Sequence, residues 1–354
     1  MSFLYCTADQ IASVSGGGIV THNEMTALAD LSVEQGQEFI CWDRNFLCGS
    51  TSPGEPWGWD TNASKRLLLD RGGLDTFRLA HFYAGTFTLT VDNVKRMGAR
   101  ISYTAAAHDI EKSRVEHIKL GLPFSYPHLD QPDLWKRYVG GYRAADVVIC
   151  PSQHSAECMR SYGCQKVEVI PHGVNLPETA VPPPTRFVVG YLGAIGPDKG
   201  LIYLLQAWKK LNYTDAVLYI AGHASKSEFV DELIRNFGGG HIIQCGWLEK
   251  VDYFYSIISL YVQPSVTEGF GIEVLEAMSY GRAVLCSEGA GAADVVPETW
   301  RFPAGDVDAL AEKIDQFRKA DLELMGAVGR GLAREYEWPK IRSRYQKVWR
   351  GLLA

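Results

Sequence analysis

Two glutamates and the glycines between them form the most informative motif of the chain. Glu268 is followed directly by Gly269-Phe270-Gly271, and seven residues separate Glu268 from Glu276. The glycines allow backbone N–H groups to approach a ligand, and the residues after them predict a helix whose first N–H groups are unpaired and partly positive. Both carboxylates could project into one crevice and bind the hydroxyl groups of a ribose and a sugar ring. Glu273, the third acid, is predicted to stabilise the first turn of the helix. The alternative is that two of these three acids only favour the start of the helix.

A glycine loop with a single lysine is the second motif. The apolar run Val188–Leu192 predicts a buried strand, and Gly193 and Lys199 follow it before the next predicted helix. Loop amides and one ammonium group together suit a diphosphate. A solvated lysine in an ordinary turn is the alternative.

Two shorter motifs lie in the first half of the chain. Ser15-Gly16-Gly17-Gly18 follows the first predicted strand, and could face the same phosphates or be a plain flexible turn. His108 follows the predicted strand 101–104, at a carboxyl end where an imidazole could donate a hydrogen bond to a sugar hydroxyl. The alternative is a structural His108 beside Asp109, with Asp109 acting as a helix cap.

The elements that must position these residues alternate along the whole chain. Short apolar runs alternate with amphipathic stretches, a pattern that is typical of open, mainly parallel α/β sheets. In the first half we expect strands at 3–6, 38–42, 79–83, 101–104, 147–150 and 167–170. In the second half we expect strands at 187–192, 217–221, 242–245, 260–262 and 283–286.

The proline-rich run Val181-Pro182-Pro183-Pro184-Thr185 predicts a linker, because proline cannot continue a helix or an inner strand. The predicted domains are therefore 1–180, joined by a C-terminal helix at 340–354, and 181–339. Sheets of this kind bind ligands at the carboxyl ends of their strands. We therefore expect the site in a cleft between the two domains.

Composition disfavours several other classes of protein. The chain has 35 Lys plus Arg against 41 Asp plus Glu, a net charge of −6, which disfavours broad nucleic-acid binding. No apolar run reaches the roughly 18 residues of a membrane span, and Met1–Thr7 has no positive region typical of a secretory signal. The eight cysteines contain no C-x-x-C pair, which favours buried free thiols over a metal site. We expect a cytoplasmic protein.

Taken together, these motifs resemble the family-4 retaining glycosyltransferases, also called group 1 glycosyltransferases. The resemblance covers nearly the whole chain and rests on the order of its motifs. They are Gly16-Gly17, His108-Asp109, Ile170-Pro171-His172-Gly173-Val174-Asn175, Gly193…Lys199-Gly200 and Glu268-Gly269-Phe270-Gly271…Glu276. The resemblance implies the GT-B fold, with two Rossmann-like doubly wound α/β domains facing a cleft. It also implies that the helix after Trp338-Pro339 crosses back onto the first domain.

The resemblance implies a role for each site residue. Glu276 binds the ribose of a nucleoside-diphosphate sugar, and Glu268 holds the donor sugar near the reacting carbon. The amides of Gly269, Phe270 and Gly271 assist Glu268. Lys199 neutralises the diphosphate in the Gly193 loop, with Gly16 and Gly17 nearby. His108 contacts a hydroxyl of the transferred sugar.

The implied reaction moves a sugar, with retention, from the nucleotide sugar to a hydroxyl group of a glycan or other acceptor. It needs no metal and no other cofactor. One residue departs from the family, which commonly has Arg where this chain has Ala194. Loss of one such donor costs about 2.7–4 kcal/mol of transition-state stabilisation. Two alternatives remain open: a sugar-nucleotide epimerase or hydrolase, and a catalytically idle protein that binds sugar nucleotides or glycans.

Overall fold

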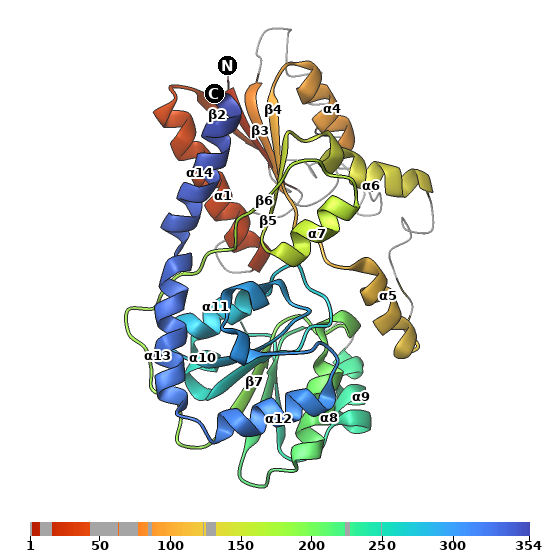
Figure 1. Cartoon of the computed structure of the whole chain (residues 1–354), viewed down its shortest axis with the longest axis vertical. Coiled ribbons are helices and arrows are strands. Elements are labelled where there is room, and N and C mark those ends of the chain that lie inside the picture. The colour runs from red at the N-terminus through yellow and green to blue at the C-terminus, as the bar shows by residue number, and fades with distance from the viewer. Residues whose placement is uncertain are drawn as a thin grey trace. The chain divides into compact units, whose positions relative to one another are not determined.

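The computed structural model describes residues 2–7, 16–42, 63, 77–83, 87–122, 124, 132–223, 227–248 and 250–354. They form two compact units (Figure 1). Unit 1 comprises Met1–Ala107, Ser125–Pro171 and Trp338–Ala354, and unit 2 comprises His108–Phe124 and His172–Glu337. Each unit is built on a parallel sheet with its own core.

Unit 1 contains a six-stranded sheet in the order β2-β1-β3-β4-β5-β6, in which every strand pair is parallel. Inner strands such as β1 are buried along their whole length, which explains why they read as continuous apolar runs. The strands are β1 (Ser2–Thr7), β2 (Glu38–Trp42), β3 (Phe77–Tyr83), β4 (Arg100–Thr104), β5 (Val147–Cys150) and β6 (Val167–Val169). The helices are α1 (Gly16–Glu34), α4 (Thr88–Arg96), α6 (Pro132–Ala144), α7 (Gln153–Ser161) and α14 (Trp338–Leu353).

Unit 2 contains a second six-stranded parallel sheet, in the order β12-β11-β10-β7-β8-β9. Helices cover both of its faces (Figure 1). The strands are β7 (Val188–Leu192), β8 (Val217–Ala221), β9 (Ile242–Gly246), β10 (Leu260–Gln263), β11 (Ala283–Ser287) and β12 (Arg301–Phe302). The helices are α5 (Ile110–Lys119), α8 (Leu201–Leu211), α9 (Ser227–Phe237), α10 (Asp252–Ile257), α11 (Ile272–Ser279), α12 (Val307–Arg318) and α13 (Leu322–Ala333), with the short 3₁₀ helix η2 (Pro197–Lys199).

The grouping of residues differs from the predicted division at several segments. We expected residues 1–180 to form one domain, whereas His108–Phe124 and the segment 172–180 group with unit 2. Trp338 and Pro339, which we expected in the second domain, group with unit 1. Tyr203 of α8 donates from its hydroxyl to Glu116 Oε2 at 2.6 Å, which fixes α5 to α8. A plain turn at Ser15-Gly16-Gly17-Gly18, one of the two interpretations of that stretch, is not observed at Gly16, where α1 already begins.

Helix α14 returns to unit 1 after the chain has passed through unit 2, and it packs beside α1 (Figure 1). The side chains that α14 buries are spaced three or four residues apart, as expected for one face of a helix. They are Trp338, Ile341, Tyr345 and Trp349. The predicted helix that returns to the first domain therefore has an apolar face that packs on unit 1.

A buried polar cluster fixes the end of α14 to the sheet. Trp349 Nε1 donates to Ser102 Oγ at 2.9 Å, and Ser102 Oγ lies 2.7 Å from His81 Nδ1. The other ring nitrogen, His81 Nε2, lies 3.1 Å from Glu24 Oε2. These side chains are almost completely buried. A buried polar group that loses its partner keeps its desolvation cost, so the cluster favours a single position of α14.

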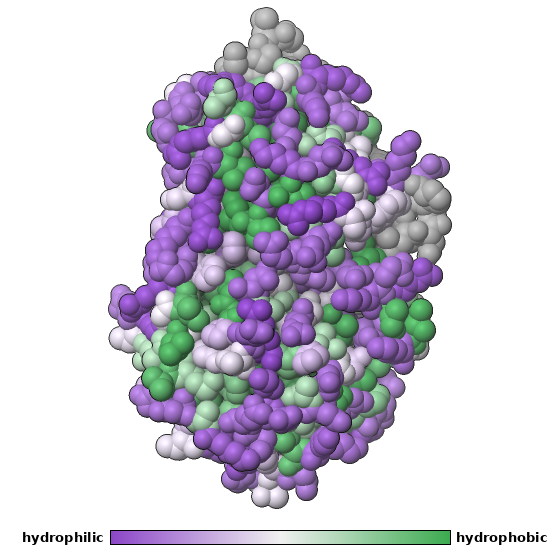
Figure 2. All heavy atoms as spheres, in the orientation of Figure 1, coloured by the Kyte–Doolittle hydropathy of each residue, from purple (hydrophilic) through white to green (hydrophobic). Residues whose placement is uncertain are grey.

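Helix α13 carries apolar side chains on its outer face, which Figure 2 shows in green. Leu324 is 61% exposed, Val328 47% and Leu332 37%. The inner face of α13 carries Gly326 at a point where the helix comes very close to the chain at Gly281. A Cβ on Gly326 would lie 2.0 Å from the carbonyl oxygen of Gly281, so only glycine fits there. Within the described ranges, no helix combines the length and the apolar character that crossing a membrane requires.

Replacing Ser102 with Ala tests the buried cluster. The variant leaves Trp349 Nε1 and His81 Nδ1 without their common partner, so we expect the free energy of unfolding to fall by about 1–3 kcal/mol. Urea denaturation of the whole chain measures this change. The matched control is Ser343→Ala on the exposed face of α14, where Ser343 Oγ donates to Pro339 O. Equal effects of the two substitutions would contradict the interpretation.

Candidate functional site

The candidate site lies where the strand order of unit 2 reverses. The chain enters the sheet at β7, continues to β8 and β9 on one side, and returns to the other side of β7 at β10. β7 and β10 are parallel neighbours, with Val189 opposite Leu260 and Gly190 opposite Tyr261. The loops after both strands therefore leave the sheet at the same edge, which is where doubly wound sheets bind ligands.

The two loops are locked together by their backbones. Val266 N–H donates to Asp198 O at 2.8 Å. Gly200 has a φ of +69°, and a Cβ at this position would lie 2.0 Å from Pro264 O. Only glycine fits this conformation and this close approach. The glycine loop that holds Lys199 is thus built against the loop that holds Glu268.

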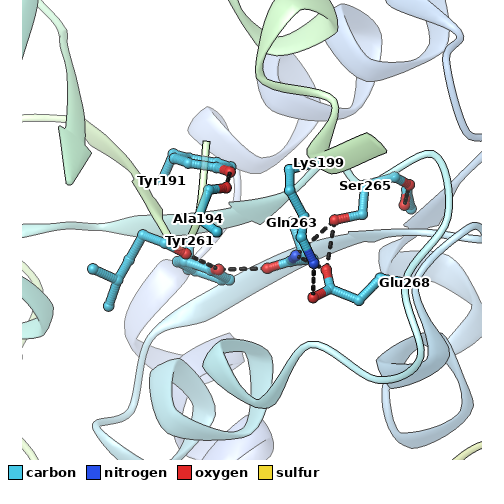
Figure 3. A network of polar contacts seen from close by, with 9 residues as sticks. Tyr191, Ala194, Lys199, Tyr261, Gln263, Ser265 and Glu268 are labelled. Atoms are coloured by element: carbon cyan, nitrogen blue, oxygen red, sulfur yellow. Dashed lines mark hydrogen bonds and ion pairs between the residues drawn. The ribbon is translucent and has the colours of Figure 1, made fainter. Parts of the chain in front are cut away.

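Lys199 and Glu268 form an ion pair between these loops (Figure 3). Lys199 Nζ donates to Glu268 Oε1 at 2.5 Å, and the two side chains are only 23% and 14% exposed. Glu268 Oε2 accepts from Gln263 Nε2 and from Ser265 Oγ, both at 2.7 Å. Each carboxylate oxygen of Glu268 therefore has a partner, as a buried charge requires.

The strands continue this network toward the glycine loop. The hydroxyl of Tyr261 in β10 lies 2.5 Å from Gln263 Oε1 and 3.0 Å from Leu192 O, and its single O–H can donate to either oxygen. Tyr191 of β7 donates to Ala194 O at 2.6 Å. These contacts fix the side chain of Gln263 and the start of the loop that leads to Lys199 (Figure 3).

Burial and charge oppose one another at the ion pair. Burial raises the pKa of Glu268, but the Lys199 ammonium and hydrogen bonds from Ser265 and Gln263 outweigh it and hold the pKa below its usual value. Burial lowers the pKa of Lys199, and the carboxylates of Glu268 and Asp198 more than reverse this effect. Both partners are therefore charged at neutral pH.

Helix α11 positions the second glutamate of the motif. The helix begins directly after Gly271, which has a φ of +92°. Glu276 Oε2 accepts a hydrogen bond from the hydroxyl of Tyr255 at 2.8 Å. Burial raises the pKa of Glu276 above its usual value, and the hydrogen bond from Tyr255 offsets only part of this effect. Glu276 thus lies on the first turns of α11, with one carboxylate oxygen directed to α10.

Phe270, between the two glycines of the motif, is a packing residue. Its side chain is 3% exposed, and its ring meets the ring of His172 edge-on with centroids 5.1 Å apart. His172 belongs to the predicted motif Ile170–Asn175, so two motifs that are distant in sequence contact each other here. Phe270 O also accepts from Ala292 N–H at 2.7 Å, which fixes the loop on its other side.

The segment of His108 meets the loop of Glu268 inside unit 2. Asp109 N–H donates to Thr267 Oγ1 at 2.8 Å, and Thr267 directly precedes Glu268. Asp109 also caps α5, because its side chain accepts from Lys112 N–H. The predicted capping role of Asp109 is therefore correct, while contact of His108 with a sugar stays a prediction.

Other predicted residues fall elsewhere or remain predictions. Gly16 and Gly17 form the first turn of α1 in unit 1, and their contact with phosphates stays a prediction. Sequence reasoning missed the side chains that support Glu268 and Glu276. These are Tyr255, Tyr261, Gln263 and Ser265. In the sequence, Tyr255, Tyr261 and Gln263 look like ordinary residues of a buried helix or strand, and Ser265 looks like an ordinary loop residue, so no pattern marks them.

The side chains that commonly bind metal ions form no cluster in the described part of the chain. Among these residues, no group of three or more His, Cys, Asp or Glu has an arrangement that could hold a metal ion. The cationic side chain that the network contains is Lys199. The electrostatics of the site therefore combine this ammonium, the amino end of α11 and the nearby carboxyl groups.

Alanine substitutions at two glycines test the close approach of the loops. Gly200 and Gly246 have nearly equal φ values of +69° and +66°, so both substitutions pay a backbone cost of about 1–2 kcal/mol. At Gly246 a Cβ would meet nothing within 4 Å, whereas at Gly200 it would collide with Pro264 O. We expect urea denaturation to show a clearly larger loss of stability for Gly200→Ala. Similar losses would contradict the proposed locking of the loops.

Comparison with known proteins matches both halves of the chain to glycosyltransferases. Residues 176–327 match the family model of group 1 glycosyl transferases, and residues 48–178 match that of glycosyltransferase family 4. O-antigen chain mannosyltransferase B of Escherichia coli is 32% identical over 158 residues, 42% of either chain. A lipopolysaccharide 1,2-N-acetylglucosaminetransferase of Salmonella typhimurium is 30% identical over 166 residues, 43% of this chain and 41% of the relative. These matches thus span about two fifths of each relative.

Solved structures match the chain over almost its whole length. Sucrose-phosphate synthase from Thermosynechococcus elongatus superposes with a TM-score of 0.75 at 18% identity, covering 99% of both chains. HepE of Anabaena, solved in complex with UDP and glucose, gives a TM-score of 0.72 at 14% identity, covering 99% of this chain and 100% of HepE. At these identities the structural likeness shows the fold alone, and the matches to the two family models show the family. The chain has the GT-B fold and belongs to the family-4 group 1 glycosyltransferases, as its sequence predicts.

Proposed function

We propose that the protein is a retaining glycosyltransferase that moves a sugar from a nucleoside-diphosphate sugar to a hydroxyl group of a saccharide acceptor. The observation that carries the proposal is the Lys199–Glu268 pair at the strand switch point, beside the amino end of α11. Membership of the glycosyltransferase family supports it. The relatives named for O-antigen and lipopolysaccharide synthesis support a saccharide acceptor.

The donor would bind along the edge of the sheet in unit 2. Glu276 would accept hydrogen bonds from the ribose hydroxyls at one carboxylate oxygen, while the hydroxyl of Tyr255 donates to the other, Oε2. The diphosphate would occupy the space near Gly193 and Lys199, where loop amides and the amino end of α11 supply donors. UDP and glucose in the HepE complex support a nucleotide donor for this fold.

Lys199 would stabilise the charge that develops on the leaving diphosphate. As the bond between the anomeric carbon and the phosphate oxygen breaks, that oxygen gains negative charge beside a preorganised ammonium group. The acceptor hydroxyl attacks the anomeric carbon from the face that the diphosphate leaves, and its proton passes to the departing phosphate oxygen. Glu268 keeps Lys199 in place through the 2.5 Å contact. This charge comes from the protein, so we propose a reaction that is independent of a metal ion.

Donor binding is the first prediction of this proposal. In EDTA, one class among UDP-, GDP-, ADP- and CMP-sugars should raise the melting temperature of the wild type by several degrees, since a ligand at 100 times its Kd stabilises by about 2.7 kcal/mol. Glu276→Ala should lose the shift, because it removes the ribose ligand. Glu323→Ala, an acid in the first turn of α13, is the matched control and should keep it. If no sugar nucleotide stabilises the wild type, the proposed donor site is wrong.

Turnover separates the transferase from its alternatives. With the donor that binds, Lys199→Ala should lower kcat by about 10²–10³-fold, while Lys209→Ala on the exposed side of α8 should not. NMR of the product should show the anomeric configuration of the donor. Conversion of the donor without an acceptor would favour an epimerase or hydrolase. Binding without any conversion would favour an idle sugar-nucleotide-binding protein.

A further inference from the structure

A third carboxyl group, that of Glu273, faces the glycine loop of the site. Glu273 lies in the first turn of α11 and is half-buried. Its Oε1 atom would lie 3.6 Å from a Cβ placed on Gly193. The carboxyl group is thus directed to the loop that follows β7, where the proposed function places the diphosphate.

The surroundings of Glu273 resist a further negative charge. Burial, together with the carboxylates of Glu268 and Glu276, raises the pKa of Glu273 to about 8, against a smaller opposite effect of Lys199. Asp198, which stabilises the charge of Lys199, adds another carboxylate beside the same loop. A single ammonium in this network cannot compensate all of these groups and a bound diphosphate.

Three tyrosines of the described residues also interact with Glu273. They are Tyr191 of β7, Tyr255 of α10 and Tyr261 of β10. Burial and the nearby carboxylates, Glu273 among them, raise the pKa of each hydroxyl well above its usual value. These tyrosines stay neutral and add no charge that would favour an ionised Glu273.

In its neutral form, Glu273 would stabilise the start of α11 less than an ionised acid would. An acid in the first turn stabilises a helix through its negative charge, and a protonated carboxyl group lacks that charge. Glu273 is also near its own backbone N–H, which favours the ionised form only weakly against burial. A neutral carboxyl group, in contrast, has an O–H that can donate to an anion.

We propose that Glu273 binds a phosphate oxygen of the donor diphosphate as a neutral carboxylic acid that donates a hydrogen bond. This inference rests on the proposed function and adds a residue that selects for the diphosphate. The acid supplies a donor directed at the Gly193 loop without requiring a second cation. Once ionised, the same carboxyl group repels the phosphates, so donor affinity falls as the pH rises through the pKa of Glu273.

The test compares wild type and Glu273→Gln in isothermal titration calorimetry with UDP, GDP, ADP and CDP. Gln keeps a hydrogen-bond donor but does not titrate, so its pH profile contains every titration other than that of Glu273. Between pH 7 and pH 9, the affinity of the wild type for the nucleotide that binds should fall about tenfold more than that of Glu273→Gln, because one unit above a pKa about a tenth of the acid is protonated. Glu323→Gln, in the first turn of α13, should follow the wild type. Parallel profiles of wild type and Glu273→Gln would overturn the proposal.

A second measurement needs no ligand. An acid whose pKa is raised on folding contributes stability below its unfolded pKa and loses it as the pH rises toward the folded pKa. Without nucleotide, Glu273→Gln should therefore melt close to the wild type at pH 5 and above it at pH 9. An equal melting temperature at pH 9 would show that Glu273 is not held neutral, whatever the nucleotides do. If the expected difference appears but no nucleotide binds, the proposed function fails and the diphosphate role of Glu273 fails with it.

Discussion

The contact between Lys199 and Glu268 depends on two loops that come from different strands. Each charge is largely withdrawn from water, and such a charge is costly unless a partner and hydrogen bonds compensate it. Gln263 and Ser265 supply those hydrogen bonds, and Gly200 allows the loops to approach. The result is an ammonium group held at a fixed place at the edge of the sheet. A charge that is already positioned needs no reorganisation when a substrate changes its own charge.

The carboxyl groups of α11 are compatible with the sugar nucleotide that we propose as the donor. Glu276 and Glu273 lie on one face of the helix, three residues apart. Tyr255 donates to Glu276, while Glu273 faces Gly193, so in the proposed complex the two groups would contact different parts of the donor. Burial raises the pKa of both groups, and the neutral form proposed for Glu273 would leave one negative charge fewer beside a diphosphate and Lys199.

The sequence was sufficient for the strands and for the glutamate motif, because buried parallel strands read as apolar runs and the glycines mark the loops. It was not sufficient to predict which side chains contact each other in the site. Lys199 and Glu268 are far apart in the chain, and their contact follows from the pairing of β7 with β10, which no local pattern encodes. Gly16 reads as a turn residue although it begins α1. The grouping of His108–Phe124 with unit 2 depends on contacts such as Tyr203 with Glu116, which only tertiary structure reveals.

A crystal structure with a bound nucleotide sugar would locate the donor relative to the Lys199–Glu268 pair. We expect the diphosphate in contact with Lys199 and the loop at Gly193, and the ribose hydroxyls in contact with Glu276. We also expect an oxygen of Glu273 within hydrogen-bond distance of a phosphate oxygen at neutral pH. A nucleotide bound elsewhere, with the Lys199–Glu268 pair unchanged and distant from it, would contradict the account.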